Sequence, residues 1–222
     1  MIVLGAREGR FGSRGEKKSM QPFAASSIPL VTLGTFLLWF GWFGFNGFSQ
    51  LAMGTFDDVN AISKIAVNTH LAGAAGTVTG AALTRLIGGK TDIVMMLNGA
   101  LAGLVAITAE PLTPGPITAM IIGSIGAVIM YFGTKLLENF GLDDVVGAIP
   151  VHMFAGIFGT LVVPLTNADT SFGTQFIGVI SVCVFSFALS WITFSTLKST
   201  VGLRISRAAE KQGTDKAEVG VI

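Results

Sequence analysis

The stretch Asp143–Thr160, DDVVGAIPVHMFAGIFGT, decides how the rest of the chain is interpreted. It opens with two carboxylates and continues as an apolar run that contains one imidazole, His152. If the acidic pair Asp143 and Asp144 caps a helix, a rise of about 1.5 Å per residue puts His152 roughly 12 Å along it. That is near the middle of a bilayer core about 30 Å thick. Ionisable groups are costly there, so His152 is a candidate for lining a substrate or proton path; the alternative is a histidine satisfied between packed helices.

The composition is that of a membrane protein. Of the 222 residues, 51% are hydrophobic and only 12% are charged, whereas an average soluble domain carries about 25% charged residues. A net charge of +1, without a basic face, gives no reason to expect a nucleic-acid partner. The single cysteine, Cys183, lies in an apolar run and cannot form an intramolecular disulfide.

Six stretches are long and apolar enough to cross a bilayer, which takes roughly 17 to 25 residues each. Prolines lie at several of their edges, where proline starts or ends a helix. The sequence therefore predicts an all-α, polytopic membrane helical bundle with six transmembrane helices. The predicted spans are Leu30–Ser49, Ala61–Ile87, Ile93–Ala109, Ile117–Leu137, Val145–Leu165 and Phe176–Leu197.

The positive charges predict the orientation of these spans. With the N-terminus inside, thirteen of the fourteen Lys and Arg residues fall on the inner side, among them Arg14, Lys17 and Lys18, and only Lys64 falls outside. We therefore expect three parts: a cytoplasmic loop over 1–28, a membrane domain over 29–198 and a cytoplasmic tail over 199–222. The opening segment lacks the order of a secretory signal. It reads as a polar loop that follows an earlier segment, so the start of the chain looks truncated.

Two further patterns concern packing and substrate. Gly76 and Gly80 on the second span, and Gly99 and Gly103 on the third, have the spacing that lets membrane helices approach closely. The first span ends in an aromatic run, Trp39–Ser49. An interfacial aromatic belt explains such a run. A cation site explains it equally well, because aromatic faces attract a desolvated cation by about 0.5 to 2 kcal/mol.

Four ordered motifs resemble the ammonium transporter and Rhesus protein family. They are WFGWFGFN followed by Ser49, VNTHLAGAAG, NGALAGLVAITA and the opening DDVVGAIPVHMFAGIFGT. The polar tract near the start and GLRIS at Gly202–Ser206 are also similar to that family. The resemblance runs over essentially the whole chain and implies the second half, the sixth to eleventh spans, of an eleven-span fold. That fold surrounds a hydrophobic pore and is usually a trimer.

The resemblance also implies roles for individual residues. Trp42, Phe45 and Ser49 match the aromatic ammonium-recruitment region, with Phe45 in the gate, and His152 matches the second of two pore histidines. Asp143 and Asp144 are the acidic pair expected to cap that helix. His70 and Asn68 are assigned to the pore or to packing. The first pore histidine, another gating phenylalanine and an acidic recruitment residue belong to the first half, which this sequence does not resemble.

The expected function is transport of ammonium or ammonia, as a partial transporter that needs the missing first half. The expected location is the cell membrane, with both termini in the cytoplasm. The implied partners are a homotrimer or a complementary N-terminal half, and a cytoplasmic regulatory protein that reads the tail. No enzymatic reaction, cofactor or metal is expected. Two alternatives stay open: a non-transporting fragment that regulates or supports a partner, and a membrane cytochrome subunit whose His70 and His152 ligate a haem.

Overall fold

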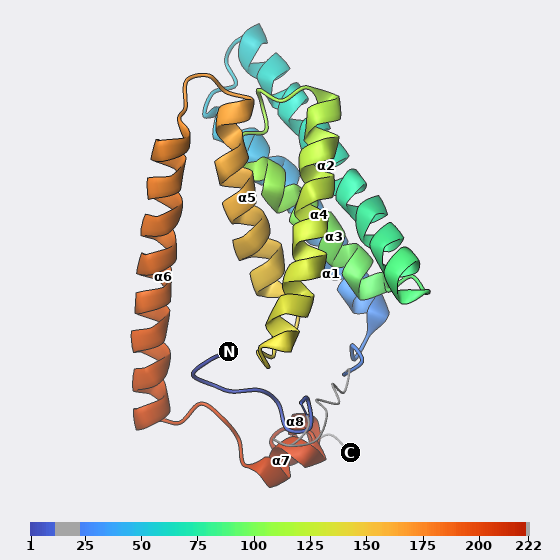
Figure 1. The fold of residues 1–222 in the computed structure, drawn as a ribbon, viewed down its shortest axis with the longest axis vertical. Helices are drawn as coiled ribbons and strands as arrows, with labels where there is room; N and C mark the ends of the chain where they lie inside the picture. The colour runs from blue at the N-terminus through green and yellow to red at the C-terminus, as the bar shows by residue number, and fades with distance from the viewer. Residues whose placement is uncertain (12–22, 221–222) are drawn as a thin grey trace. The chain divides into compact units, whose positions relative to one another are not determined.

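The computed structural model describes residues 1–11 and 23–220, and every regular element in them is helical (Figure 1). Charged residues expected on the inner side at 14, 17 and 18 lie outside the described residues. The main helices are α1 (Ile28–Gly47), α2 (Phe56–Gly88), α3 (Ile93–Thr108), α4 (Pro116–Asn139), α5 (Ala155–Val162), α6 (Phe172–Thr200), α7 (Arg207–Gln212) and α8 (Thr214–Ala217). Three short helices adjoin them: η1 (Phe48–Gln50), η2 (Ile149–Phe154), which is a π-helix, and η3 (Val163–Leu165).

The helix boundaries follow from local sequence. The Ser27 side chain caps α1 by accepting a hydrogen bond from the Leu30 amide. The Asp92 side chain caps α3 by accepting one from the Met95 amide. Thr55 and Asp58 form a reciprocal capping box at the start of α2. That helix ends at Gly89, whose φ of 77° is in the left-handed region that suits glycine.

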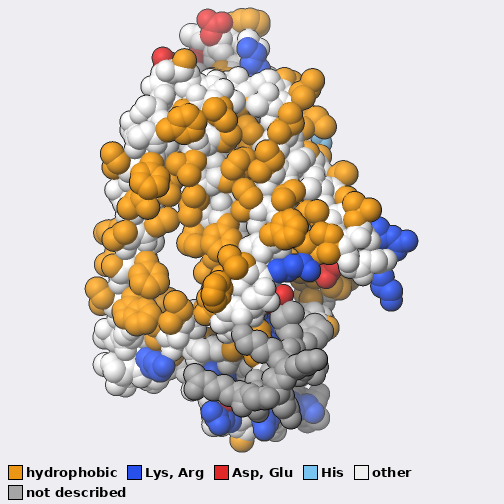
Figure 2. All heavy atoms as spheres, viewed as in Figure 1, with side chains coloured by type: hydrophobic (Ala, Val, Ile, Leu, Met, Phe, Trp, Pro, Cys, Tyr) orange, Lys and Arg blue, Asp and Glu red, His pale blue; other side chains and the backbone are white. Residues whose placement is uncertain are grey.

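Each predicted span corresponds to helical structure. Three of these helices, α1 with η1, α4 and α6, are long and apolar enough to cross a membrane. The helices Ile93–Thr108 and Ile149–Leu165 are apolar but shorter. The all-helical fold with apolar helices is confirmed. Large apolar side chains are spread over most of the face shown in Figure 2, as expected for a surface that meets lipid rather than water.

The start of the fifth predicted span is wrong. We expected a helix to begin at Val145, directly after the acidic pair. Instead, the helical turns begin at Ile149 behind the N-cap Ala148, which makes no side-chain cap hydrogen bond. Residues 145 and 146 form a bend, and Gly147, which follows it, has a φ of 75°. This left-handed residue turns the chain before the helix starts, so His152 lies in the first helical turn rather than deep within a longer helix.

The chain divides into two compact units. Among the described residues, the first contains 1–11, 23–24, 137–144 and 181–220, and the second contains 25–136 and 145–180. The division follows space rather than chain order, because the N-terminal segment and the tail belong to one unit. The predicted boundaries of the membrane domain, after residues 28 and 198, stay a prediction.

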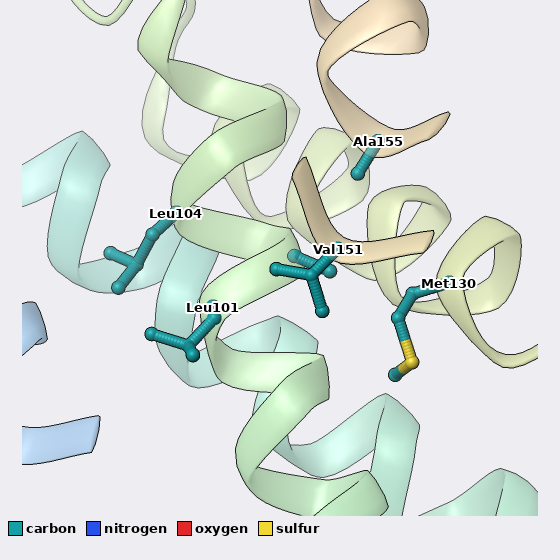
Figure 3. Close-up of a cluster of buried hydrophobic side chains, with 6 residues drawn as sticks. Leu101, Leu104, Met130, Val151 and Ala155 are labelled. Carbon is teal, nitrogen blue, oxygen red and sulfur yellow. The ribbon is translucent and has the colours of Figure 1, made fainter. Parts of the chain in front are cut away.

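The second unit contains the apolar core (Figure 3). Leu101 and Leu104 of α3 meet Val151 of η2, Ala155 of α5 and Met130 of α4 in one buried cluster. Leu104, Met130 and Ala155 are fully buried. This cluster fixes the position of the helical turn that carries His152 against α3.

The glycines of α2 and α3 bring these two helices into backbone contact. A Cβ added at Gly76 would overlap the carbonyl oxygen of Gly99, and one added at Gly99 would lie 2.6 Å from that of Gly76. A Cβ at Gly80 would lie 3.0 Å from the Met95 oxygen. These glycines therefore have the packing role that their spacing predicted.

Candidate functional site: an aromatic and imidazole wall

Helix α1 presents aromatic rings on two faces. Trp39 and Phe43 are four residues apart and share one face, while Trp42 and Phe45 are three apart and share another. The helix is held to α2 by the buried Asn46 amide, whose Nδ2 donates to Thr69 Oγ1 at 2.9 Å. With α1 in this orientation, Trp39 and Phe43 contact His70 of α2, while Trp42 contacts Thr108 of α3 and His152 of η2.

The structure brings Trp42, Phe45 and His152 together. The Trp42 and His152 rings are nearly parallel, at 12°, with centroids 6.5 Å apart. The Phe45 ring packs edge to face against the Trp42 ring, with an interplanar angle of 63° and centroids 6.1 Å apart. Trp42 Nε1 donates to Thr108 Oγ1 at 2.7 Å. One indole therefore links a phenyl ring, an imidazole and the end of α3; we call Trp42, Phe45 and His152 the ring wall.

The ring wall is open on one side. Phe45 is 66% exposed, and His152 is exposed although it is surrounded in sequence by apolar residues. Trp42 is half-buried. A cation near these rings would meet aromatic faces and an imidazole whose nitrogens can donate or accept hydrogen bonds. The open side offers space for a substrate or for another protein surface.

His152 is positioned by a π-helical turn. Such turns are rare and are frequent at functional sites. Asn98 of α3 holds the approach to it, because its Nδ2 donates to the Val146 oxygen at 3.0 Å. A Cβ at Gly147 would lie 2.7 Å from the same nitrogen, which explains a glycine there. Asn98 is the first residue of the motif NGALAGLVAITA, but the sequence analysis assigned it no role in the site.

His70 lies at a different place. Its ring contacts Trp39 at 5.5 Å and Phe43 at 6.2 Å between centroids, on the α1 face other than the one that meets His152. The two histidines therefore do not form a pair around one ligand, which gives no support to bis-histidine haem ligation. Within the described ranges, no group of three or more His, Cys, Asp or Glu residues could hold a metal ion.

Asn68 makes contacts between helix α2 and the turn that joins α3 to α4. Its buried side chain donates from Nδ2 to the carbonyl oxygens of Pro111, at 2.9 Å, and Pro114, at 2.8 Å. These bonds satisfy backbone groups of the turn between α3 and α4. Of the two roles considered for Asn68, pore lining and packing, the contacts favour packing.

Ser49 lies in η1, beyond the end of α1. Its hydroxyl donates to the Phe45 carbonyl oxygen at 3.2 Å, and the residue is exposed. The hydroxyl oxygen keeps lone pairs that can accept a hydrogen bond from a cation. Its helical register relative to Phe45 puts it one turn along from the ring wall.

Asp143, the first of the two acidic residues before the His152 helix, binds arginines of the N-terminal segment. Its carboxylate receives Arg7 Nε at 2.8 Å and Nη2 at 2.9 Å, and Arg10 Nε lies 3.4 Å away. Hydrogen bonds from Arg7 hold the pKa of Asp143 below its usual range, more strongly than burial raises it. Asp143 therefore anchors the N-terminal segment in the first unit, while the helix it was expected to cap begins at Ile149.

Nearby contacts in the same unit join the tail to the N-terminal segment. Lys198 Nζ donates to the Val3 oxygen at 2.7 Å, and Arg204 bonds Glu210 at 2.8 Å. Glu210 also accepts from the Glu8 amide at 2.8 Å. The Arg204 guanidinium lowers the pKa of the Glu210 carboxyl. The two ends of the described chain therefore form one charged assembly.

These features define a class: an all-helical membrane protein in which an aromatic helix stacks an indole on an imidazole. The comparisons give the family. The model of the Ammonium Transporter Family matches residues 1–221, and the chain belongs to this family. The resemblance of the four sequence motifs is thereby confirmed.

Individual relatives agree with this placement. The chain is 38% identical to ammonium transporter Amt2 of Archaeoglobus fulgidus over 98% of its own length and 49% of the relative. It is 36% identical to a putative ammonium transporter of Synechocystis sp., covering 98% of this chain and 41% of that one. The chain thus spans about half the length, or less, of these relatives.

Solved structures share the fold. A sensor Amt protein superimposes with a TM-score of 0.89 at 33% identity, covering 98% of this chain and 55% of the other. Nitrosomonas europaea Rh50, whose structure is described with the conduction mechanism of Rhesus channels, gives a TM-score of 0.69 at 25% identity. That match covers 84% of this chain and 49% of the other.

Proposed function

We propose that this chain forms part of a membrane path for ammonium or ammonia and that it conducts only with a complementary first half. The observation that carries the proposal is the open ring wall of a chain in the ammonium transporter family. Phe45 and His152 are exposed where a path would need a second wall. The relatives it resembles are about twice its length, which is consistent with a missing wall.

The proposed chemistry follows from desolvation. Moving a bare ammonium ion into hydrocarbon is prohibitive, so the path must offer aromatic faces to the cation and then release a proton. Phe45 and Trp42 would supply those faces, and the Ser49 oxygen would accept a hydrogen bond at the entrance. His152 would exchange hydrogen bonds with ammonia farther along. Trp42 directly joins these two steps because its ring contacts both Phe45 and His152.

We further propose a multi-pass protein of the cell membrane with both ends of the chain in the cytoplasm. The bias of Lys and Arg supports this orientation. The bonds that Val3 and Leu4 accept from Lys198 and Arg204 support a shared side for the two ends. A homotrimer, or assembly with a complementary half, and a cytoplasmic regulator that reads the tail complete the proposal.

The proposed function is tested by methylammonium uptake in cells that lack their own ammonium transporters. The chain is expressed alone and with the first five spans of a full-length relative. Uptake only with the partner is the expected result. Uptake by the chain alone would refute the need for a second wall. No uptake in either case, with both proteins in the membrane, would favour a non-transporting fragment.

Replacing His152 by alanine is expected to lower methylammonium uptake by the assembled pair about tenfold. One lost hydrogen bond of about 1.4 kcal/mol to the permeating molecule produces an effect of this size. Cys183→Ala is the matched control, because Cys183 lies on α6 and outside the ring wall. Equal uptake by the two variants, at equal membrane levels, would remove His152 from the proposed path.

A further inference from the structure

Thr108, the last residue of α3, makes two short hydrogen bonds beside the ring wall. Its Oγ1 accepts from Trp42 Nε1 at 2.7 Å, and its hydroxyl lies 2.6 Å from the Leu104 carbonyl oxygen, to which it donates. Because the hydroxyl proton is directed at Leu104, the lone pairs of the same oxygen point elsewhere. Thr108 is therefore an acceptor with a fixed direction.

We propose that Thr108 is a positioning residue: it sets the plane of the Trp42 indole and, through it, the ring face presented to His152. This inference rests on the proposed function only for its consequence in transport. The Thr108–Trp42 hydrogen bond and the stacking of Trp42 on His152 are present in the chain whether or not it transports ammonium. It links three elements, α1, α3 and the π-helix η2, through one oxygen and one indole.

Packing by itself leaves the indole plane less constrained. The torsion that turns an aromatic ring about its Cβ–Cγ bond is broad rather than confined to sharp wells. An indole N–H has one donor direction, in the plane of the ring. A partner in a fixed position therefore selects one ring plane from that broad range.

Trp39 provides an internal comparison on the same helix. Its Nε1 is buried and has no hydrogen-bond partner among the described residues. Its ring edge instead packs on Gly73, where an added Cβ would lie 2.9 Å from Trp39 Cζ2. One indole of α1 is thus held by packing, and the other has a directed hydrogen bond. The directed bond belongs to the indole that contacts His152.

The plane of Trp42 matters because two neighbours depend on it. The 12° angle to His152 and the 63° angle to Phe45 are both set by the same indole. A cation is attracted to the face of an aromatic ring and not to its edge. Rotating the indole would turn its face away from the imidazole and change the surface that a permeating cation meets.

The first test needs no transport. The chain is labelled with ¹⁵N at indole and imidazole nitrogens in detergent micelles, and Trp42→Phe identifies the Trp42 signal. Thr108→Val keeps the size of the side chain and removes the hydroxyl. It is expected to move the Trp42 indole signal and the His152 ring signals, while those of Trp39 and Trp191 stay in place. Thr108→Ser is expected to restore the wild-type spectrum.

Either of two spectra would overturn the inference. In the first, the Trp42 signal does not move in Thr108→Val. In the second, it moves but the His152 signals do not, so that the hydrogen bond exists without positioning the stack. Should Thr108→Val fail to fold, Thr108→Ala is read by the same two criteria.

The second test uses methylammonium uptake by the assembled pair. Thr108→Val is expected to lower uptake about threefold to tenfold, in line with one directed hydrogen bond, and Thr108→Ser to retain it. Unchanged uptake by Thr108→Val, with a shifted Trp42 signal, would refute positioning in transport. If the wild-type pair itself takes up nothing, the proposed function fails, and the spectra still decide the role of Thr108 in the stack.

Discussion

Replacing Gly76 by alanine is expected to destabilise the second unit by about 3 kcal/mol. The added methyl group would overlap the Gly99 carbonyl oxygen and would lie 3.2 Å from the Gly103 Cα. Both neighbours are backbone of α3, which cannot rotate away as a side chain can. Overpacking of this kind costs about 1 to 3 kcal/mol, and separating two backbones lies at the upper end. The measurement is the free energy of unfolding in detergent micelles.

Gly178→Ala is the matched control. Gly178 lies in α6 and an added Cβ there would meet nothing within 4 Å. In a helix interior, alanine is favoured over glycine by about 1 kcal/mol, so this control should be neutral or more stable. If the two variants had equal stability, close backbone packing between α2 and α3 would not explain the glycine pattern.

Replacing Asp143 by alanine is expected to destabilise the first unit by about 2 kcal/mol. The change removes the acceptor of three Arg7 hydrogen bonds, one from the backbone amide and two from the guanidinium, and the partner of Arg10. Breaking a fully buried pair costs roughly 3 to 5 kcal/mol. The smaller value follows because the Arg7 side chain is 36% exposed, while that of Asp143 is only 2% exposed. The measurement is the rate at which a protease cleaves the N-terminal segment, which Asp143 binds through Arg7. This rate is expected to be higher in Asp143→Ala than in wild type.

The same interaction predicts the direction of a pH effect. Hydrogen bonds from Arg7 depress the folded-state pKa of Asp143. The stabilisation is therefore fully present above the unfolded-state pKa of about 3.9 and is lost as the pH falls through the lower folded-state value. The difference in cleavage rate between wild type and Asp143→Asn should be large near neutral pH and should shrink in acid. Asp169→Ala, at an exposed site between α5 and α6, should match wild type throughout. A difference that grew in acid would contradict the assigned pair.

Some features could be predicted because they depend on composition and spacing. Apolar length predicted the helices, and the repeat of Gly76, Gly80, Gly99 and Gly103 predicted a close contact that the backbone distances confirm. The family resemblance, confirmed by the match over residues 1–221, depended on ordered motifs. It selected Trp42, Phe45 and His152, which the fold then brings together.

Other features could not be predicted because they depend on contacts between distant residues. Asp143 lies next to Asp144 before an apolar run, a pattern that favours a helix cap. Only the fold shows Arg7, 136 positions earlier, in contact with it. Likewise, Thr108 is one of many threonines until α3 places its hydroxyl against the Trp42 indole.

The sequence by itself determined that this is a helical membrane protein, because burial of apolar residues in lipid and local helix signals act over a few turns. Its ordered motifs, rather than its composition, carried the resemblance to the ammonium transporter family. The tertiary structure decided which faces meet. It packed His70 of α2 and His152 of η2 against different faces of α1. It also started the His152 helix at Ile149 and paired Asp143 with Arg7. These outcomes depend on how the chain turns at Gly147 and on contacts between residues far apart in the chain, which no single stretch of residues encodes.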